Sequence, residues 1–487
     1  MDRALRLGEQ TVMSRAKSIL ILPCLLAAGG AWGEDSGDAR LLFTGDILLS
    51  RQVRHEIERT RRFPWEPFAD LFHRADWVAG NLEGAVGEVR DCTPEVSASP
   101  CFDIPEALIP LLAKAGFHAV GTANNHAGDL GPRGRDATRR ALVQAGLGVL
   151  SFEDSPVFVA AGGRTLGVIA VSTVPGRDGS RTEIPCTALR QKLRLARSLS
   201  DMVVVFVHWG SELLEWPDTR QRAAAAWLVQ NGADLIVGHH PHVVQAAECV
   251  AGRPVFYSLG NHLFDQKYPA AKQGLMADCR LHGKVLRCGG IPTIAPPGSA
   301  FPQLSRDAYG GATDALQACT VNLPGPDSVG EVSLRGRAAE GNGDLQYAME
   351  GWRGGVRTWR SAAMPLVSVQ IGKLAGPQGP DYLFTLERRR STIDGEDGLR
   401  PYVYEAGPKG LVARWRGSAL AWPLLDAVLL PGRDELLCAL HRRDSFVVLQ
   451  PDSAGVRTAV YRWNGFGFSG VEDASAVAAC RAMFPVP

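Results

Sequence analysis

Four short apolar segments of this sequence each end in side chains of the types that bind metal ions. The segments are LLFTGD (41–46), HAVGTANNH (118–126), MVVVFVHWG (202–210) and ADLIVGHHPH (233–242). Runs of Val, Leu, Ile and Phe that alternate with helical patterns predict parallel strands covered on both faces. In sheets of this kind, ligands bind beyond the carboxyl ends of the strands. The pattern therefore predicts an α/β fold with a metal site at one edge of the sheet.

The composition agrees with such a fold and excludes one class of partner. The chain has 487 residues, of which 45% are hydrophobic and 21% charged, as is typical of a globular protein with two or three domains. Its formal net charge is only +1, so no overall field attracts a polyanion. We therefore expect no nucleic-acid partner.

The first 33 residues predict a secretory signal peptide. Arg15 and Lys17 precede an apolar run at 19–28, and a short exit segment follows at 31–33. An uncleaved membrane anchor is the alternative, although the run has only about half of the roughly 20 residues that span a bilayer. We expect an exported protein, either periplasmic or extracellular.

The cysteines also fit an oxidising compartment. The chain has ten, and nine remain if Cys24 leaves with the signal peptide, so at least one is unpaired. Two pairs bracket short segments and are plausible local disulfides, Cys92 with Cys101 and Cys279 with Cys288. A thiolate zinc site is disfavoured because the sequence contains no C-x-x-C pair.

The pattern of elements divides the chain. Residues 40–265 alternate between predicted strands and helices, with helices at 105–115, at 135–145 and from Asp218 to a stop at Gly232. From 267 to 345 the periodicity fades into Gly, Pro and Ser, which predicts insertions and a linker. The expected organisation is a signal peptide (1–33), an α/β domain (38–300), a linker or insertion (301–349) and a β domain (350–487).

The last part predicts an all-β domain, either a sandwich or a fragment of a propeller-like repeat, because short alternating strands follow one another at regular spacing. The aromatic residues of this domain have two interpretations. The favoured one is that they pack in half-buried strands, and the alternative is that they line a polymer-binding groove. They are Tyr402, Tyr404, Trp415, Trp422, Tyr461 and Trp463.

The residue types at the strand ends suit divalent zinc, manganese or iron, which bind neutral imidazoles and carboxylates. Asn125 and His208 each have another interpretation, as a turn residue and as a core histidine. The tandem histidines His239, His240 and His242 favour ligation more strongly. His239 is expected to point away from the other two, since adjacent strand residues face opposite sides.

Taken together, the motifs resemble the CapA family, the poly-gamma-glutamate capsule biosynthesis proteins with a calcineurin-like metallophosphoesterase fold. The matching segments are TGD (44–46) with Arg51 downstream, NLEG (81–84), ANNHAGDLG (123–131), HWG (208–210), GHHPHVVQ (238–245) and SLGNHLFDQ (258–266). The resemblance covers about 40–266. It implies a layered α/β/β/α domain, followed here by a smaller all-β domain.

The resemblance also implies roles for individual residues. Asp46 and His242 would bind one metal, Glu83 would bridge, and the second metal would take Asn125, His208 and His240. Outside the metal shell, His126 would contact a phosphoryl oxygen or protonate a leaving group, and Arg51 would neutralise a substrate anion.

Three further residues have supporting roles on this interpretation. Asp129 and Asn261 would orient the ligand loops by hydrogen bonds, and His262 is expected to pack rather than to bind metal.

The sequence departs from phosphoesterases at two positions. Ile47 and Leu48 follow Asp46 where phosphoesterases have Asp-x-His, and the bridging position carries Glu83 rather than an aspartate. The first departure is shared by the family, and a weak or empty first metal site is one consequence. One or two ions of manganese, zinc or iron are therefore expected.

These observations predict an exported metal-dependent hydrolase or transferase that acts on a phosphate or amide bond in capsule or cell-envelope polymer metabolism. Its partner would be an anionic polymer or a phosphorylated envelope substrate, with membrane-associated capsule machinery nearby. The alternative is a non-catalytic accessory protein that binds or guides an anionic polymer. A metal that only stabilises the fold is a third hypothesis.

Overall fold

The computed structural model describes residues 38–88, 100–305, 312–317, 319–339, 345–390, 397–407, 409–417, 420, 423–442 and 455–484. The predicted signal peptide, Cys92 and Trp422 lie outside these residues. Within them, no helix has both the length and the apolar character needed to cross a membrane.

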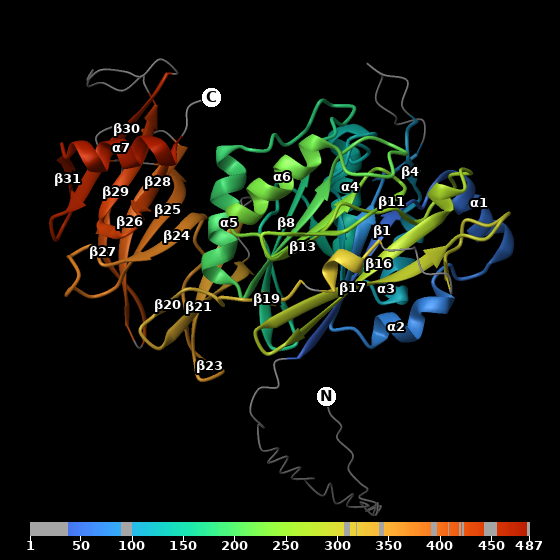
Figure 1. The fold of residues 1–487 in the computed structure, drawn as a ribbon, viewed down its shortest axis with the longest axis horizontal. Helices are drawn as coiled ribbons and strands as arrows, with labels where there is room; N and C mark the ends of the chain where they lie inside the picture. The colour runs from blue at the N-terminus through green and yellow to red at the C-terminus, as the bar shows by residue number, and fades with distance from the viewer. Residues whose placement is uncertain are drawn as a thin grey trace, which may run out of the picture. The chain divides into compact units, whose positions relative to one another are not determined.

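Two sheets stack face to face in the first part of the chain (Figure 1). The first has the order β18-β17-β16-β1-β2-β5-β6, with β15 also paired to β1 and β19 to β17. Its strands are β1 (Ala39–Ile47), β2 (Trp77–Leu82), β5 (Ala119–Gly121), β6 (Gly148–Leu150), β15 (Asn261–Leu263), β16 (Gln273–His282), β17 (Val285–Ile294), β18 (Gln303–Leu304) and β19 (Val321–Asn322).

The second sheet has the order β12-β13-β10-β9-β8-β7, and its four central strands are parallel. It consists of β7 (Val157–Ala161), β8 (Arg164–Ser172), β9 (Met202–His208), β10 (Leu235–His239), β12 (Glu248–Val250) and β13 (Arg253–Phe256). Phe43 of β1 packs edge-on against Phe206 of β9 in the layer between the sheets. Short pairs complete this part of the chain, β3 (Ala85–Val86) with β4 (Asp103–Ile104) and β11 (Val244–Gln245) with β14 (Ser258–Leu259).

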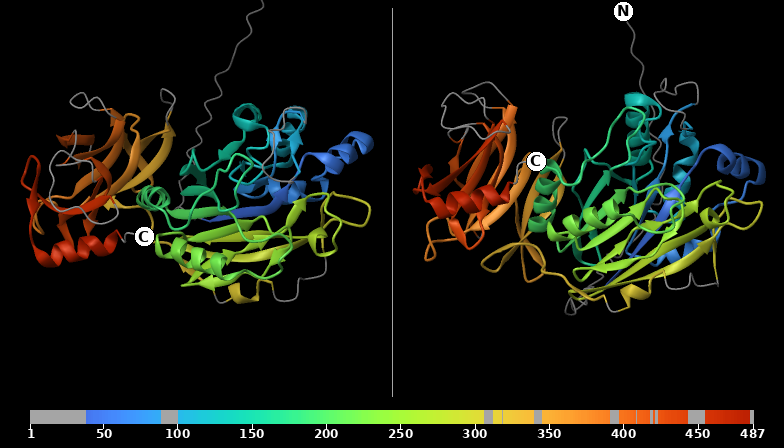
Figure 2. Two further views of the ribbon diagram at one scale, coloured as in Figure 1. Left: turned by 90° about the horizontal axis from the view of Figure 1, so that it is seen from above. Right: turned by 45° about the horizontal axis from the view of Figure 1, so that its top comes forward.

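Helices cover both outer faces, so the expected α/β/β/α layering is confirmed (Figure 2). The first sheet is covered by α1 (Arg51–Thr60), α2 (Ala69–His73), α3 (Pro110–Ala115) and α4 (Gly131–Gln144), and the second by α5 (Thr187–Leu199) and α6 (Thr219–Gln230). The α6 helix begins where the sequence predicts, because Asp218 accepts from the backbone of Gln221 in a capping box. The helix expected at 105–115 is shorter, with a 3-10 turn at Glu106–Leu108 before α3.

The prediction that insertions begin at 267 is wrong for the first part of that segment. β16 pairs with β1 over Ala39–Phe43, and β17 forms a hairpin with β16. Leu275, Met276 and Ala277 are fully or almost fully buried, so the strand belongs to the core. The predicted Cys279–Cys288 disulfide is present and joins the two strands of this hairpin.

Two further disulfides were not predicted. Cys249 bonds to Cys319, and Cys438 bonds to Cys480. Cys186 is free, which agrees with the expected odd thiol.

A four-stranded antiparallel sheet follows, with strands β20 (Ser328–Val329), β21 (Val332–Ala339), β22 (Gln346–Arg353) and β23 (Val356–Arg360). Most of these strands fall in the segment expected to be a linker or insertion. Tyr347 of β22 packs on Phe158 of β7, so this sheet shares a core with the α/β layers.

The C-terminal part is all-β, as predicted, and forms one eight-stranded antiparallel sheet with the order β24-β25-β26-β28-β29-β30-β31 and β27 on β26. The strands are β24 (Leu366–Gly372), β25 (Tyr382–Arg390), β26 (Asp397–Gly407), β27 (Gly410–Arg416), β28 (Leu424–Leu430), β29 (Arg433–Arg442), β30 (Val456–Trp463) and β31 (Phe468–Val471). The helix α7 (Ala474–Met483) packs on this sheet, tied to β29 by the Cys438–Cys480 bond.

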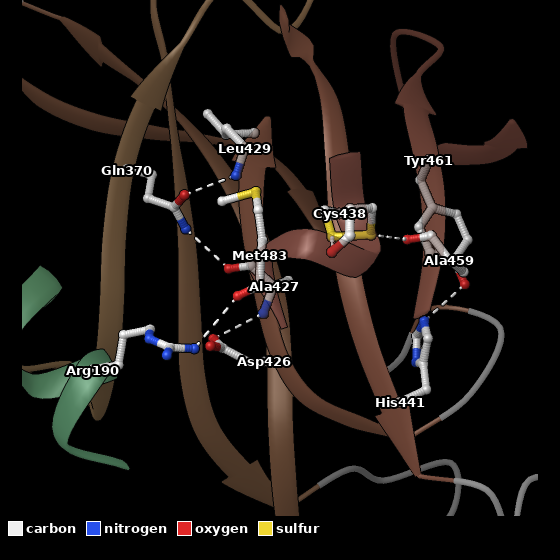
Figure 3. The surroundings of a disulfide bond; sticks show 11 residues. Arg190, Gln370, Asp426, Ala427, Leu429, Cys438, His441, Ala459, Tyr461 and Met483 are labelled. Atoms are coloured by element: carbon white, nitrogen blue, oxygen red, sulfur yellow. Dashed lines mark hydrogen bonds between the residues drawn. A yellow bond between two sulfur atoms is a disulfide. The ribbon is translucent and has the colours of Figure 1, made fainter. Parts of the chain in front are cut away.

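Polar side chains connect elements that are not adjacent in the strand order of this sheet, such as β24 and β28 (Figure 3). The Gln370 amide donates to the Ala427 carbonyl at 3.0 Å and accepts from the Leu429 N–H at 2.8 Å. Tyr461 and Trp463, like Tyr404, are less than 10% exposed. These aromatic residues therefore pack in the core of the sheet, as the favoured interpretation expected.

Candidate metal centre

The side chains predicted to bind metal lie together where strands of both sheets end. Asp46 is in β1, Glu83 follows β2, Asn125 follows β5, His208 ends β9, and His240 and His242 follow β10. All are buried except Asn125, which is half-buried. Because parallel strands bring their carboxyl ends to one edge, segments far apart in the sequence meet there.

Backbone geometry at two strand ends permits this approach. A Cβ at Gly45 would lie 1.9 Å from the Gly260 carbonyl oxygen, so only glycine allows the end of β1 to contact the 260 turn. His240 and His242 have φ of 98° and 60°, in the left-handed region that non-glycine residues rarely adopt. Strained backbone at two potential ligands is a feature common at functional sites.

One group of potential ligands combines Asp46, Glu83 and His208, each with a ligand atom within 4.8 Å of the other two. Asn81 donates to Asp46 Oδ1 at 2.8 Å, and the same amide lies 3.4 Å from His208 Nδ1. The other ring nitrogen of His208, Nε2, lies 2.8 Å from Asn125 Oδ1. Asn125 and His208 thus lie together, as the resemblance implies.

His242 connects the two carboxylates. Its Nδ1 lies 3.2 Å from Asp46 Oδ2 and 3.0 Å from Asn261 Oδ1, and its Nε2 lies 3.6 Å from Glu83 Oε1. The ring of His240 lies 4.7 Å from that of His208, centroid to centroid.

Glu83 is the most unusual group of the site. Its carboxylate is fully buried, and neither oxygen has a hydrogen-bond partner within the described residues. Burial raises the pKa of this carboxyl to about 8. A buried carboxylate without partners is destabilising unless a positive group reaches it.

The imidazoles around Glu83 differ in how readily they take up a proton. Burial, followed by the influence of His242, lowers the pKa of His240 to about 3, and burial lowers the pKa of His208 well below its ordinary value. Burial opposes protonation of His242 as well, but the Glu83 and Asp46 carboxylates raise its pKa to about 9. Burial likewise opposes ionisation of Asp46, yet its hydrogen bond with His242 lowers the pKa of that carboxyl.

These features fit a bound divalent cation. Metal ligands must be deprotonated carboxylates and neutral imidazoles, and a cation would replace the proton that the Glu83–His242 pair now holds. The oxygen and nitrogen donor set matches manganese, zinc or iron rather than a thiolate-bound metal.

His126 stands beside this cluster with a fixed orientation. Its Nδ1 lies 2.8 Å from Asp129 Oδ2, its Nε2 faces Glu83 Oε1 at 3.8 Å, and its ring stacks on Phe102 with centroids 3.9 Å apart. Asp129 is in turn 3.2 Å from Arg177 Nε, a side chain with only 8% exposure. No motif in the sequence pointed to Arg177, which lies in an irregular loop after β8.

Arg51 also contacts Phe102, with its guanidinium 4.9 Å from the ring centroid. It forms an ion pair with Asp265, whose side chain is almost fully buried. Arg51 is therefore near His126 but already has a carboxylate partner.

Two histidines lie outside the cluster. His239 Nε2 is 3.2 Å from the Thr44 carbonyl oxygen, and its ring stacks on Phe206, so it points away from His240 as strand alternation predicts. His262 lies among Phe68, Phe72 and Phe117 and is a packing residue.

The stacked sheets and the buried carboxylates, imidazoles and amides at their shared edge define a domain of the calcineurin-like metallophosphoesterase class. Residues 40–266 match the family described as "Bacterial capsule synthesis protein PGA_cap". This segment is similar to that family, and CapA proteins of two Bacillus species are among the relatives of the chain.

Three similar proteins have names that agree with this family match. The capsule biosynthesis protein CapA of Bacillus anthracis is 30% identical over 260 residues, which are 50% of this chain and 63% of the relative. The PGA biosynthesis protein CapA of Bacillus subtilis is 28% identical over 254 residues, 49% of this chain and 67% of the relative. A protein of Mycobacterium tuberculosis named as a probable polyglutamine synthesis accessory protein is 26% identical over 270 residues, 49% of this chain and 70% of the relative. The chain thus spans less than two thirds of the first of these proteins.

Proposed function

We propose that this chain is an exported metal-dependent hydrolase or transferase that acts on a phosphate or amide bond in capsule or cell-envelope polymer metabolism. The observation that carries the proposal is Glu83, a fully buried carboxylate with no hydrogen-bond partner for either oxygen in the described structure. The names of the Bacillus relatives, which concern capsule and PGA biosynthesis, support the polymer context.

Asp46, Glu83, His208, His240 and His242, with Asn125, would hold one or two ions of manganese, zinc or iron. When bound, such an ion acts as a Lewis acid and lowers the pKa of a bound water.

The protein's own residues supply orientation and proton transfer. Asp129 accepts from His126 Nδ1, which leaves His126 Nε2 as the ring nitrogen that faces the cluster. In the protonated state this nitrogen can donate to a leaving group. Phe102 and Phe264 limit the access of water to these residues. The Phe102 ring stacks on His126, and the Phe264 ring lies 4.7 Å from that of His242.

Arg51 would contribute to binding rather than to proton transfer. Its side chain is 36% exposed and remains next to Phe102 and His126 while it pairs with Asp265. A phosphate or carboxylate group of an anionic polymer that reached His126 would meet this guanidinium.

The test is the metal content of the purified chain, compared with the double variant His240→Ala, His242→Ala. A matched control removes two exposed histidines, His73→Ala and His282→Ala. We expect bound manganese, zinc or iron in the unmodified chain and in the control, and loss in the first variant. Absence of metal from the unmodified chain after incubation with each of the three ions would contradict the proposal.

If metal is bound, turnover of phosphoester and amide substrates should depend on it. An exported localisation is tested separately, by following whether 1–33 is removed when the chain is secreted.

A second candidate is a non-catalytic accessory protein that holds or guides an anionic polymer, and the printed name of the Mycobacterium tuberculosis relative favours it. Such a protein would bind poly-gamma-glutamate without turnover under any of the three metals. Polymer binding that survives the double variant, with no reaction at any stage, would select this candidate.

A further inference from the structure

Glu212 is a carboxylate at the metal centre that neither the motif analysis nor the resemblance assigned. It lies in the loop between β9 and α6, four positions after His208. Its carboxylate, a ring nitrogen of His240 and one of His242 all lie within 4.8 Å of one another. The site therefore contains a second group of three potential ligands beside Asp46, Glu83 and His208.

The backbone fixes Glu212 in this place. The N–H of the next residue, Leu213, donates to the Pro241 carbonyl at 2.8 Å, directly between the two histidines. On the other side, the Trp209 N–H donates to the His239 carbonyl at 3.1 Å. The loop that carries Glu212 is thus bonded to the segment that carries His240 and His242.

Side-chain contacts hold the rest of the loop. Gln245, which is buried, donates to the carbonyls of Leu214 at 2.8 Å and Trp216 at 3.1 Å. Gly210 has a φ of +84°, and a Cβ there would lie 2.7 Å from the Gln221 side chain. The sharp turn after β9 thus depends on glycine, and it directs the loop back over β10.

Buried polar atoms in the same cluster lack partners. His240 Nδ1 is buried and has no hydrogen-bond partner within the described residues, and the same holds for both oxygens of Glu83. His240 is 5% exposed and Glu83 is fully buried, so water does not reach them freely. Unpartnered atoms of ligand-type side chains, next to an anchored carboxylate, point to a cation.

We propose that Glu212 is a direct metal ligand that acts with His240 and His242. This carboxylate would compensate for the histidine that is absent from the first strand, where Ile47 and Leu48 follow Asp46. The inference rests on the metal centre of the proposed function and adds one residue to it. Carboxylate oxygen is a good ligand for manganese, zinc and iron, and a solvent-exposed ligand gives the ion an entry path.

The grouping adds to the expected division of ligands. The resemblance implies that His240 joins His208, and that His242 joins Asp46, and both pairs are neighbours in the structure. Glu212 lies beside His240 and His242 as a further potential ligand.

The experiment compares Glu212→Gln with Glu215→Gln, an exposed glutamate of the same loop, in the full chain. Manganese and zinc alone are the probes. The measurements are bound metal per chain by mass spectrometry, affinity by competition with a chromophoric chelator, and the rise in melting temperature on adding each ion. We expect Glu212→Gln to lose one metal or to weaken binding at least about tenfold, and to lose part of the thermal shift, with no change in Glu215→Gln.

The outcomes separate this inference from the proposal on which it rests. If Glu83→Gln loses metal while Glu212→Gln binds it like the unmodified chain, the centre stands and the role of Glu212 is refuted. If the unmodified chain binds neither ion, both fail. A Glu212→Asp variant that recovers part of the affinity would support ligation, because the shorter carboxylate retains the charge and donor type.

Discussion

Buried carboxylates occur in both halves of the chain, and their surroundings differ. In the C-terminal sheet, Glu387 is fully buried and accepts from the Tyr404 hydroxyl at 2.8 Å and from Arg389 Nε at 2.6 Å. In the α/β half, Glu83 is equally buried and accepts from nothing in the described part of the chain. Burial of a charge is therefore not by itself a sign of function here. The absence of an internal hydrogen-bond donor is the feature that separates the two sites.

Asp426 extends the comparison. Both of its oxygens accept from Arg194 of α5 at 2.6 Å, and it has no exposed surface. This pair links a helix of the α/β half to β28, so the carboxylate contributes to docking rather than to chemistry.

The largest effect is expected where an internal partner is removed. Arg194→Met leaves Asp426 buried without its cation, and we expect a loss of about 3 kcal/mol in the free energy of unfolding. The value is at the low end for buried pairs because Arg194 is 21% exposed. Urea denaturation of the variant and the unmodified chain measures this loss. The dependence of the unfolding free energy on urea concentration should have the same slope in both proteins. Arg190→Met, one turn earlier in α5, removes a 3.4 Å hydrogen bond to Met483 and a cation–π contact with Trp227 at 5.7 Å, and should change little.

The second prediction tests Glu387 directly. Glu387→Gln replaces a charge-assisted acceptor by an amide whose single oxygen cannot accept from both Arg389 and Tyr404 as the two carboxylate oxygens do, so we expect a loss of about 2 kcal/mol. Glu405→Gln is the control, since its partner Arg414 is 49% exposed and surface pairs contribute little. Equal effects of the two substitutions in thermal unfolding would show that the buried network is not stabilising.

The third prediction concerns His262, whose two ring nitrogens also lack partners within the described residues. Burial lowers the pKa of His262 to about 3. Below its ordinary value near 6.5, the unfolded chain binds a proton that the folded chain does not, so stability falls as the pH drops from about 6.5 towards about 3.

His262→Phe should remove this dependence, with a gain of about 2 kcal/mol at pH 5 and a smaller gain at pH 8. Urea unfolding of both proteins at the two pH values measures it. A gain that is the same at both values would mean that packing, not protonation, decides the effect. The variant should bind metal normally, because His262 lies among phenylalanines and not among the ligands.

The smallest effect is expected at Glu83 itself, and its sign is opposite to that at Glu387. In the metal-free protein, Glu83→Gln removes a buried carboxyl without hydrogen-bond partners, whose nearest cation, His242, lies 3.6 Å away and also faces Asp46, so we expect a gain of about 1 kcal/mol. The same variant should lose the rise in melting temperature that manganese or zinc causes in the unmodified chain. Destabilisation of the metal-free protein would indicate that Glu83 is a structural group like Glu387.

The sequence predicted an α/β fold and the position of the potential ligands because both follow from a local rule, and the resemblance to the CapA family implied the α/β/β/α layers. Apolar strands were visible in the sequence, and polar residues after parallel strands meet at one edge. The grouping of those ligands was not predictable, since it depends on the left-handed backbone at His240 and His242 and on the turn at Gly210. Glu212 comes to the site by that turn.

Other misses have different causes. The helix α5 was not among the expected helices. Its buried Leu189, Leu193 and Ala196 recur at helical spacing, which is a pattern that predicts a helix. The disulfide between Cys249 and Cys319 joins residues 70 positions apart, and spacing alone cannot choose among the possible pairings. The strands β16 and β17 were obscured by the Gly- and Pro-rich sequence that surrounds Gly289 and Gly290.

The dispersal of the potential ligands along the chain has a consequence for how this protein matures. The side chains from Asp46 to His242 come from both sheets, and they approach one another only after the layer between the sheets has formed. A nascent or translocating chain therefore presents isolated histidines and carboxylates rather than a chelating site. Metal acquisition would be a late step, and the ion would be drawn from the compartment in which folding is completed.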